Sequence, residues 1–138
     1  MHLKAVCAVV AAAFLLTACN KKAETQAEVQ RDVAKAQAEG QRDVADARAD
    51  VQEANADADK QVADAIADHD EEDVAREAHD ANETADKGKS KIMIAQAEAD
   101  HKVAVEKCDA LTGPAQRECK DNADRALDQA RETAKANR

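Results

Sequence analysis

Large apolar side chains are scarce after residue 19 in this chain of 138 residues. The single aromatic residue, Phe14, lies within the first nineteen residues, and beyond them large apolar residues come about once in every two helical turns. Full burial of one Val or Leu contributes about 1.5–3 kcal/mol, so they are too few to stabilise one compact globule. The 44% hydrophobic content is mostly alanine. This composition predicts long helices or a disordered chain.

The first nineteen residues have the pattern expected of an export signal. A basic residue, Lys4, precedes an apolar run over 5–16, which is too short to span a bilayer comfortably. Small residues and a cysteine follow, in the order Leu16, Thr17, Ala18, Cys19. These four residues resemble the lipobox of bacterial, and in particular proteobacterial, lipoproteins. The resemblance implies cleavage before Cys19, a diacylglycerol group on its sulfur and acylation of the new amine.

Such an anchor, with several acyl chains, would hold the mature protein stably on a membrane. In the lipoproteins that it resembles, an aspartate after the lipidated cysteine favours the inner membrane. Asn20 stands at this position, so the resemblance favours the periplasmic face of the outer membrane over the inner membrane.

Two cysteines, Cys108 and Cys119, remain after signal cleavage and lipidation, and in an oxidising compartment they are expected to form a disulfide. They stand five residues to either side of the Gly113–Pro114 junction, a pair of residues typical of a helix end followed by a new helix. We therefore predict an antiparallel helical hairpin closed by a disulfide, which contributes about 3 kcal/mol. A redox-active pair is the alternative, although catalytic dithiols are usually closer in sequence. A zinc site is weaker still, since only His101 lies nearby.

The symmetry of this hairpin also predicts pairs of neighbours farther from the bend: Ala104 with Ala123, Val105 with Asn122, His101 with Ala126, and Ala97 with Ala130. The surrounding segment resembles a group of uncharacterised, alanine-rich exported proteins of proteobacteria. The resemblance covers only the last quarter of the chain and implies no activity. The residues that carry it are Lys107, Cys108, Asp109, Leu111, Gly113 and Cys119.

Residues 30–63 repeat every eleven positions, which is 3.67 residues per turn and close to the helical period. Like positions therefore form one narrow, weakly apolar stripe along a helix. Its three columns are Val29, Gly40, Val51, Val62; Val33, Val44, Asn55, Ile66; and Ala36, Ala47, Ala58, His69. We expect one long helix over 23–86 that frays or depends on a partner, because many of its charged neighbours repel one another. Gly88 and Ser90 predict a hinge over 87–90.

The middle of the chain is a polyanion: residues 43–86 contain sixteen acidic and three basic side chains. This charge excludes nucleic acid as a partner and would be repelled by an anionic membrane surface. The candidates for binding a divalent metal are His69 with Asp73 and His79 with Glu83, each pair spaced to share a helical face. The EF-hand spacing is absent, and a solvated acidic face is the favoured interpretation.

These features predict an all-α protein without a globular core. Its expected segments are a cleaved signal over 1–18, an anchor and tether over 19–22, an acidic helix over 23–86, partly disordered if unpartnered, a hinge over 87–90 and a disulfide-closed hairpin over 91–138. We expect no cofactor and no enzymatic activity, because catalytic geometry requires a packed supporting shell.

The favoured function is that of a structural or interaction lipoprotein of the cell envelope, with the disulfide-closed hairpin at its distal, recognition end. Contact with an envelope protein or peptidoglycan is expected, and helix packing allows a homo-oligomer. Two alternatives are weak cation binding and stress protection, because the eleven-residue repeats resemble those of desiccation-protective proteins.

Overall fold

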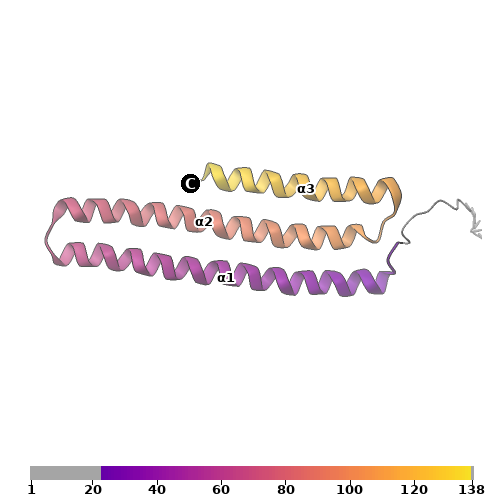
Figure 1. The fold of residues 1–138 in the computed structure, drawn as a ribbon, viewed down its shortest axis with the longest axis horizontal. Coiled ribbons are helices and arrows are strands. Elements are labelled where there is room, and N and C mark those ends of the chain that lie inside the picture. Colours follow the sequence, from indigo (N-terminus) through magenta and orange to yellow (C-terminus); the bar gives the residue numbers. More distant parts are fainter. Residues whose placement is uncertain (1–22, 138) are drawn as a thin grey trace, which may run out of the picture.

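The computed structural model describes residues 23–137, which form three helices and, within that range, no strand. They are α1 (Gln26–Ala67), α2 (Glu71–Cys108) and α3 (Gly113–Ala136). The predicted all-α class is confirmed, and α2 and α3 form the predicted disulfide-closed hairpin. Figure 1 shows the three helices running side by side, each antiparallel to the one before it.

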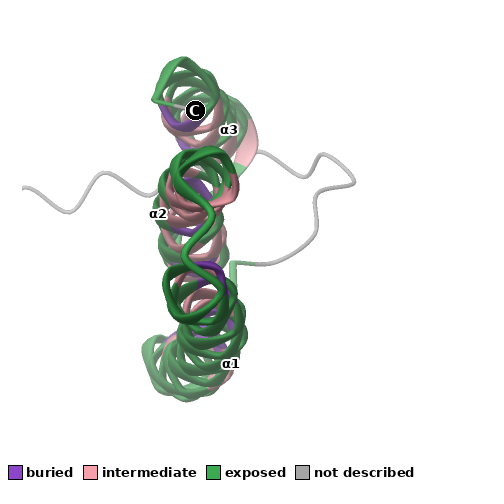
Figure 2. Ribbon diagram, turned by 90° about the vertical axis from the view of Figure 1, so that its left-hand side faces the viewer, coloured by how far each residue is buried: buried purple, intermediate pink, exposed green. Residues whose placement is uncertain are grey.

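The helices form a layer that is one helix thick. α2 packs against both neighbours, whereas α1 and α3 do not touch, and in the end-on view of Figure 2 the three lie in one file. With 42 residues, α1 has a length of about 63 Å. No side chain is enclosed by all three helices, in agreement with the predicted lack of a globular core. The buried residues follow two seams along α2.

The predicted helix boundaries in the acidic region are wrong. The chain turns at residues 68–70, where His69 adopts a left-handed conformation with φ 57°. Asp70 then begins α2 by accepting hydrogen bonds from the backbone N–H groups of Glu72 and Asp73, at 3.0 and 3.1 Å. Two of the three turn residues are aspartates, which tolerate turns and cap helices without any glycine.

The predicted hinge over 87–90 is likewise wrong, because these residues lie inside α2. Gly88 and Ser90 are both buried. A Cβ atom on Gly88 would lie 2.6 Å from a Val51 methyl group of α1, and the Ser90 hydroxyl donates to the Ala134 carbonyl of α3 at 2.8 Å. Small residues at these positions allow neighbouring helices to approach α2 closely.

The stripe predicted from the eleven-residue repeat forms the seam between α1 and α2. Of its three columns, only Ile66 and His69 are exposed, and both lie at the turn end of the layer. The closest approach is at Gly40, where an added Cβ would lie 2.6 Å from the Ala99 Cβ. The buried members of this stripe are Val29, Ala36, Gly40, Val44, Ala47 and Ala58.

The seam between α2 and α3 follows the predicted symmetry about the bend. The His101 imidazole also reaches across it, with its Nε2 2.6 Å from a carboxylate oxygen of Asp124. One groove is lined by three of the predicted pairs: Ala97 with Ala130, His101 with Ala126, and Ala104 with Ala123.

α3 ends where the facing edge of α2 changes from small and apolar to charged. Residues at spacings of three and four lie on one helical edge. Between Ser90 and Cys108 this edge is covered, but before residue 90 it is exposed. Its members there are Glu72, Arg76, His79 and Glu83. A further stretch of α3 would bury these charges at a cost.

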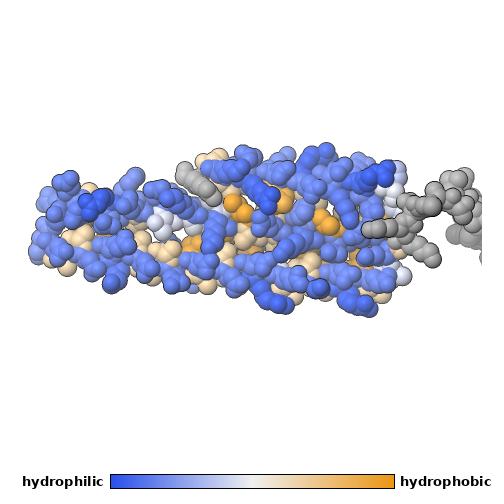
Figure 3. Space-filling view, in the orientation of Figure 1, coloured by the Kyte–Doolittle hydropathy of each residue, from blue (hydrophilic) through white to orange (hydrophobic). Residues whose placement is uncertain are grey.

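The shorter α3 leaves residues 52–86 as a two-helix projection, which we call the acidic arm. It contains thirteen Asp and Glu residues and only two basic ones, Lys60 and Arg76, a net charge of −11. The space-filling view in Figure 3 shows hydrophilic side chains over most of this face of the layer. The most hydrophobic residues on this face (orange) lie between the helices, and weakly hydrophobic ones (tan) are scattered among the hydrophilic side chains.

The start of α1 depends on a titratable cap. Thr25 and Glu28 form a capping box, in which the Thr25 hydroxyl and backbone N–H both donate to Glu28 Oε2, at 2.7 and 2.8 Å. These bonds lower the pKa of Glu28 below its ordinary 4.5.

A carboxyl whose pKa is lowered by folding stabilises the fold above its unfolded pKa, and this contribution is lost as pH falls through the folded value. We therefore expect the first turn of α1 to fray below pH 4.5, measured as lower protection of the amides after Thr25 relative to their intrinsic exchange rate at each pH. The Glu28→Gln variant should show exchange protection there that no longer changes with acid. An unchanged acid response in this variant would contradict the assignment.

Candidate functional site

The two ends of the layer differ in chemistry, and each is a candidate functional region. We call the end that carries the start of α1 and the α2–α3 turn the anchor end. There the Glu24 backbone N–H donates to the Asp109 carbonyl at 3.2 Å. Partial desolvation, and then the charge of Asp109, raise the pKa of the Glu24 carboxyl. The predicted lipidation residue, Cys19, lies outside the described residues and precedes this contact by five positions.

The proximity of Glu24 to Asp109 corrects the expected position of the hairpin. A single helix over 23–86 would have placed the disulfide far from the N-terminal side of the chain. Because α1 folds back along α2, the disulfide lies at the anchor end and the turn over 68–70 lies at the opposite end (Figure 1). The element distal to the predicted anchor is therefore the acidic arm.

The Cys108–Cys119 disulfide is present as predicted, with the two Cα atoms 5.7 Å apart. Cys108 is only 1% exposed. Next to it, the Asp109 carboxylate accepts from Lys120 and Gln116, each at 2.7 Å. Burial removes one sulfur from attack by an external thiolate, so the pair is suited to a structural role.

The acidic arm holds a large uncompensated charge on exposed side chains. Its two basic residues are already paired within it: Lys60 lies 3.8 Å from Asp64, and Arg76 lies 2.7 Å from Asp73. Asp73 also raises the pKa of Arg76. Such exposed pairs contribute little to stability. At the edge of the arm, Glu83 and Asp86 are paired with Lys87 and Lys89. Most of the other carboxylates of the arm present a negative surface to solvent.

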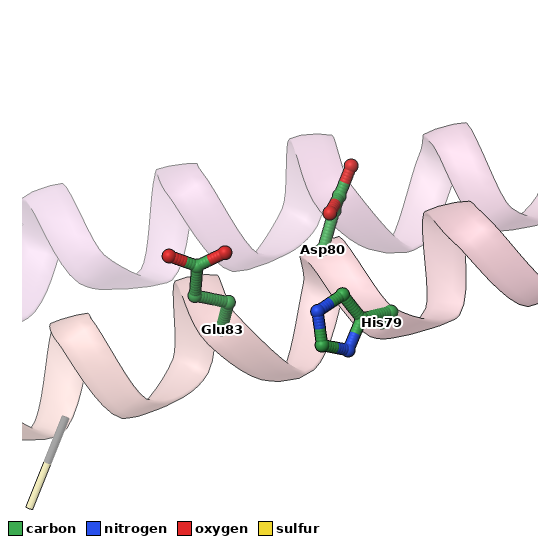
Figure 4. A group of neighbouring side chains, drawn as sticks. All are labelled: His79, Asp80 and Glu83. Atoms are coloured by element: carbon green, nitrogen blue, oxygen red, sulfur yellow. The ribbon is translucent and has the colours of Figure 1, made fainter.

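The predicted metal candidates are only partly brought together. The nearest donor atoms of His79 and Glu83 lie, together with that of Asp80, within 4.8 Å of one another on α2 (Figure 4). His69 lies in the exposed turn, and Asp73 is paired with Arg76. Asp80 was not among the predicted candidates, although its spacing of three residues from Glu83 was a detectable signal.

The cluster of His79, Asp80 and Glu83 is fully exposed and partly compensated. Lys87 lies 2.6 Å from Glu83 and is the main cause of the lowered pKa of that carboxyl. A cation at this position would compete with Lys87 and with water. Weak, screened cation attraction is the most that this arrangement supports, and cation binding stays a prediction.

No protein-family model, no curated protein and no solved structure matches this chain. Within residues 23–137, none of the helices has the length and apolar character needed to cross a bilayer. The sequence and the geometry of the two ends are therefore the basis for the function proposed below.

Proposed function

We propose that this protein is a non-enzymatic lipoprotein of the cell envelope, anchored by acyl chains on Cys19 at the periplasmic face of the outer membrane. Its helical layer holds the acidic arm away from the membrane for contact with a partner. The observation that carries the proposal is that the N-terminal side of the chain and the acidic arm lie at opposite ends of the layer. The chain following the lipobox enters at the anchor end, through the Glu24–Asp109 contact, and the net charge of −11 lies toward the other end.

The length and composition of the layer suit this role. α1 contains 42 residues and so spans about 63 Å. The α1 part of the acidic arm, residues 52–67, is the distal 16 of these 42 residues. An anionic arm is repelled by anionic lipid headgroups, and this repulsion favours an orientation in which the arm points away from the membrane.

The partner that the arm fits is a basic surface of another envelope protein. Opposite charges accelerate encounter and set orientation more than they raise affinity, as expected of exposed carboxylates on a helical scaffold. Contact with peptidoglycan and self-association through the helix faces are alternative uses of the same rod. Each would place the interaction along or beyond the arm, and not at the disulfide.

The stress-protective alternative relied on the eleven-residue repeat. In the fold, that repeat has a packing function, since its columns form the seam against α2. A period of 3.67 residues keeps small side chains on one edge of a nearly straight helix. The repeat is thus accounted for without a drying-induced transition, which supports the anchored-rod proposal.

Replacement of the lipidated residue tests the proposal. In cells that process lipoproteins, we expect the Cys19→Ser variant to incorporate no labelled palmitate and to leave the membrane fraction. The matched control is Cys7→Ser, which removes a signal-segment cysteine outside the lipobox and should keep both properties. Equal palmitate labelling and membrane recovery for Cys19→Ser and the parent would contradict the proposal.

A further inference from the structure

We propose that the turn between α2 and α3, residues 109–113, makes a second contact with the anchoring membrane, in which Leu111 enters the lipid interface. This inference rests on the lipoprotein function proposed above. It assigns a role to the turn that the lipid anchor alone does not require. The occupant of this surface is the lipid bilayer itself, and not a second protein.

The tether between Cys19 and the first described residue is short. Residues 19 and 23 are separated by four peptide units, so their Cα atoms are at most about 14 Å apart. The next residue, Glu24, donates from its backbone N–H to Asp109 at 3.2 Å. A lipidated Cys19 would therefore hold Asp109 within about 20 Å of the acyl chains. The headgroup region lies between the acyl chains and water, so the tether keeps the turn close to the membrane surface.

The stretch around Leu111 differs in composition from the rest of the chain. Residues 110–116 are all uncharged, and no longer uncharged stretch occurs after residue 22 in a chain with 36% charged residues. Leu111 is 40% exposed although it is one of the few large apolar residues, and Pro114 beside it is exposed as well. The Asp109 carboxylate, the nearest negative charge, is compensated by Lys120 at 2.7 Å.

The opposite end of the layer has no comparable uncharged stretch. Ile66 is also exposed, at 56%, but it lies among Asp64, Asp68 and Asp70. Inserting it into lipid would require desolvation of these carboxylates, which is costly. Of the exposed large apolar residues at the two ends, only Leu111 lies within an uncharged stretch of the chain. The short tether and the neutral turn therefore favour a layer that stands on its anchor end.

The chain contains no tryptophan or tyrosine, so one introduced indole reports on a single position. The test uses the lipidated Leu111→Trp protein in vesicles of phosphatidylethanolamine and phosphatidylglycerol that contain brominated lipid. The matched control is lipidated Ile66→Trp, with the indole at the end of the acidic arm. We expect strong quenching and a blue-shifted emission for Leu111→Trp, and no quenching above background for Ile66→Trp.

A measurement on the unsubstituted protein controls for membrane insertion that is caused by the introduced indole itself. Two samples are compared: the lipidated parent bound to vesicles, and the de-lipidated chain in detergent-free buffer. Amide exchange of residues 110–113 should be slower in the first sample, whereas exchange of residues 67–70 should be the same in both. The protein could float with the vesicles while the two variants are quenched equally, or while exchange at 110–113 is unchanged. Either result would overturn the membrane contact of the turn. A chain that carries no acyl groups and does not float would instead overturn the lipoprotein function.

Discussion

Loss of the Cys108–Cys119 disulfide is expected to release α3 from α2 while α1 and α2 stay paired. α3 contacts only α2, so nothing else in the layer holds it in place. The disulfide closes a short loop, with the two cysteines eleven residues apart, and such a crosslink contributes about 3 kcal/mol in the chain-entropy model. The effect should be local, because the seam between α1 and α2 does not include either cysteine.

The remaining contacts between α2 and α3 are too small to replace this crosslink. On α3 the buried residues are Ala123 and Ala134, and alanine gains much less from burial than Val or Leu. The buried hydrogen bond from Ser90 to the Ala134 carbonyl adds about 1 kcal/mol. Helix α3 has 24 residues, and most of the stability of a helix in a protein comes from its packing against other elements.

Hydrogen exchange with and without a reductant measures this effect. Reduction should speed amide exchange across residues 115–134 and leave α1 unchanged. The Cys108→Ala/Cys119→Ala protein should exchange rapidly there in either condition, which separates the bond from other effects of the reductant. Slow exchange in α3 after reduction would show that the alanine seam suffices, and a uniform loss of protection would show that the layer unfolds as one unit.

The Gly40→Val substitution is expected to separate α1 from α2. A Cβ at residue 40 would lie 2.6 Å from the Ala99 Cβ and 3.1 Å from the Ala99 Cα. The second of these atoms is backbone, so no side-chain rotation relieves the overlap and the helices must move apart. Overpacking of this kind costs about 1–3 kcal/mol, and a branched side chain adds two further methyl groups.

Thermal unfolding of matched variants tests the Gly40 contact. Ala38→Val places the same side chain on the exposed side of the same turn and should change the stability by less than about 1 kcal/mol. Gly40→Ala should also destabilise, although alanine favours a helix over glycine by about 1 kcal/mol. Combining it with Ala99→Gly should recover stability by moving the methyl group across the seam. A stabilised Gly40→Val protein would show that the helices do not approach at this point.

The parts of the fold that could be predicted depend on regular spacing in the sequence. The eleven-residue repeat indicated which edge of α1 is buried, and the position of Gly113 between two cysteines indicated the hairpin. Neither pattern identifies the partner of α1, since a narrow alanine stripe can pack on any similar helix. The fold-back at residues 68–70 was missed because the turn contains no glycine or proline, and its aspartates resemble the rest of the acidic segment.

Gly88 and Ser90 were interpreted as a hinge because small residues occur both in hinges and at close helix contacts. Their local sequence does not distinguish these cases, and only the position of Val51 opposite Gly88 does. The candidate site was predictable to a similar extent. His79 and Glu83 were found from their spacing along one helix, whereas the placement of the disulfide at the anchor end follows only from the fold-back.

The fold-back of α1 along α2 determines which residues lie at each end of the rod. Small-angle X-ray scattering of residues 20–138 without a lipid, extrapolated to the monomer, measures this fold-back directly. The layer predicts a radius of gyration of about 20 Å and a longest dimension of about 70 Å. An unfolded chain of this length would give a radius of gyration of about 35 Å, and continuous helices without the turn at 68–70 would extend beyond about 110 Å. Either of the larger values would contradict the account.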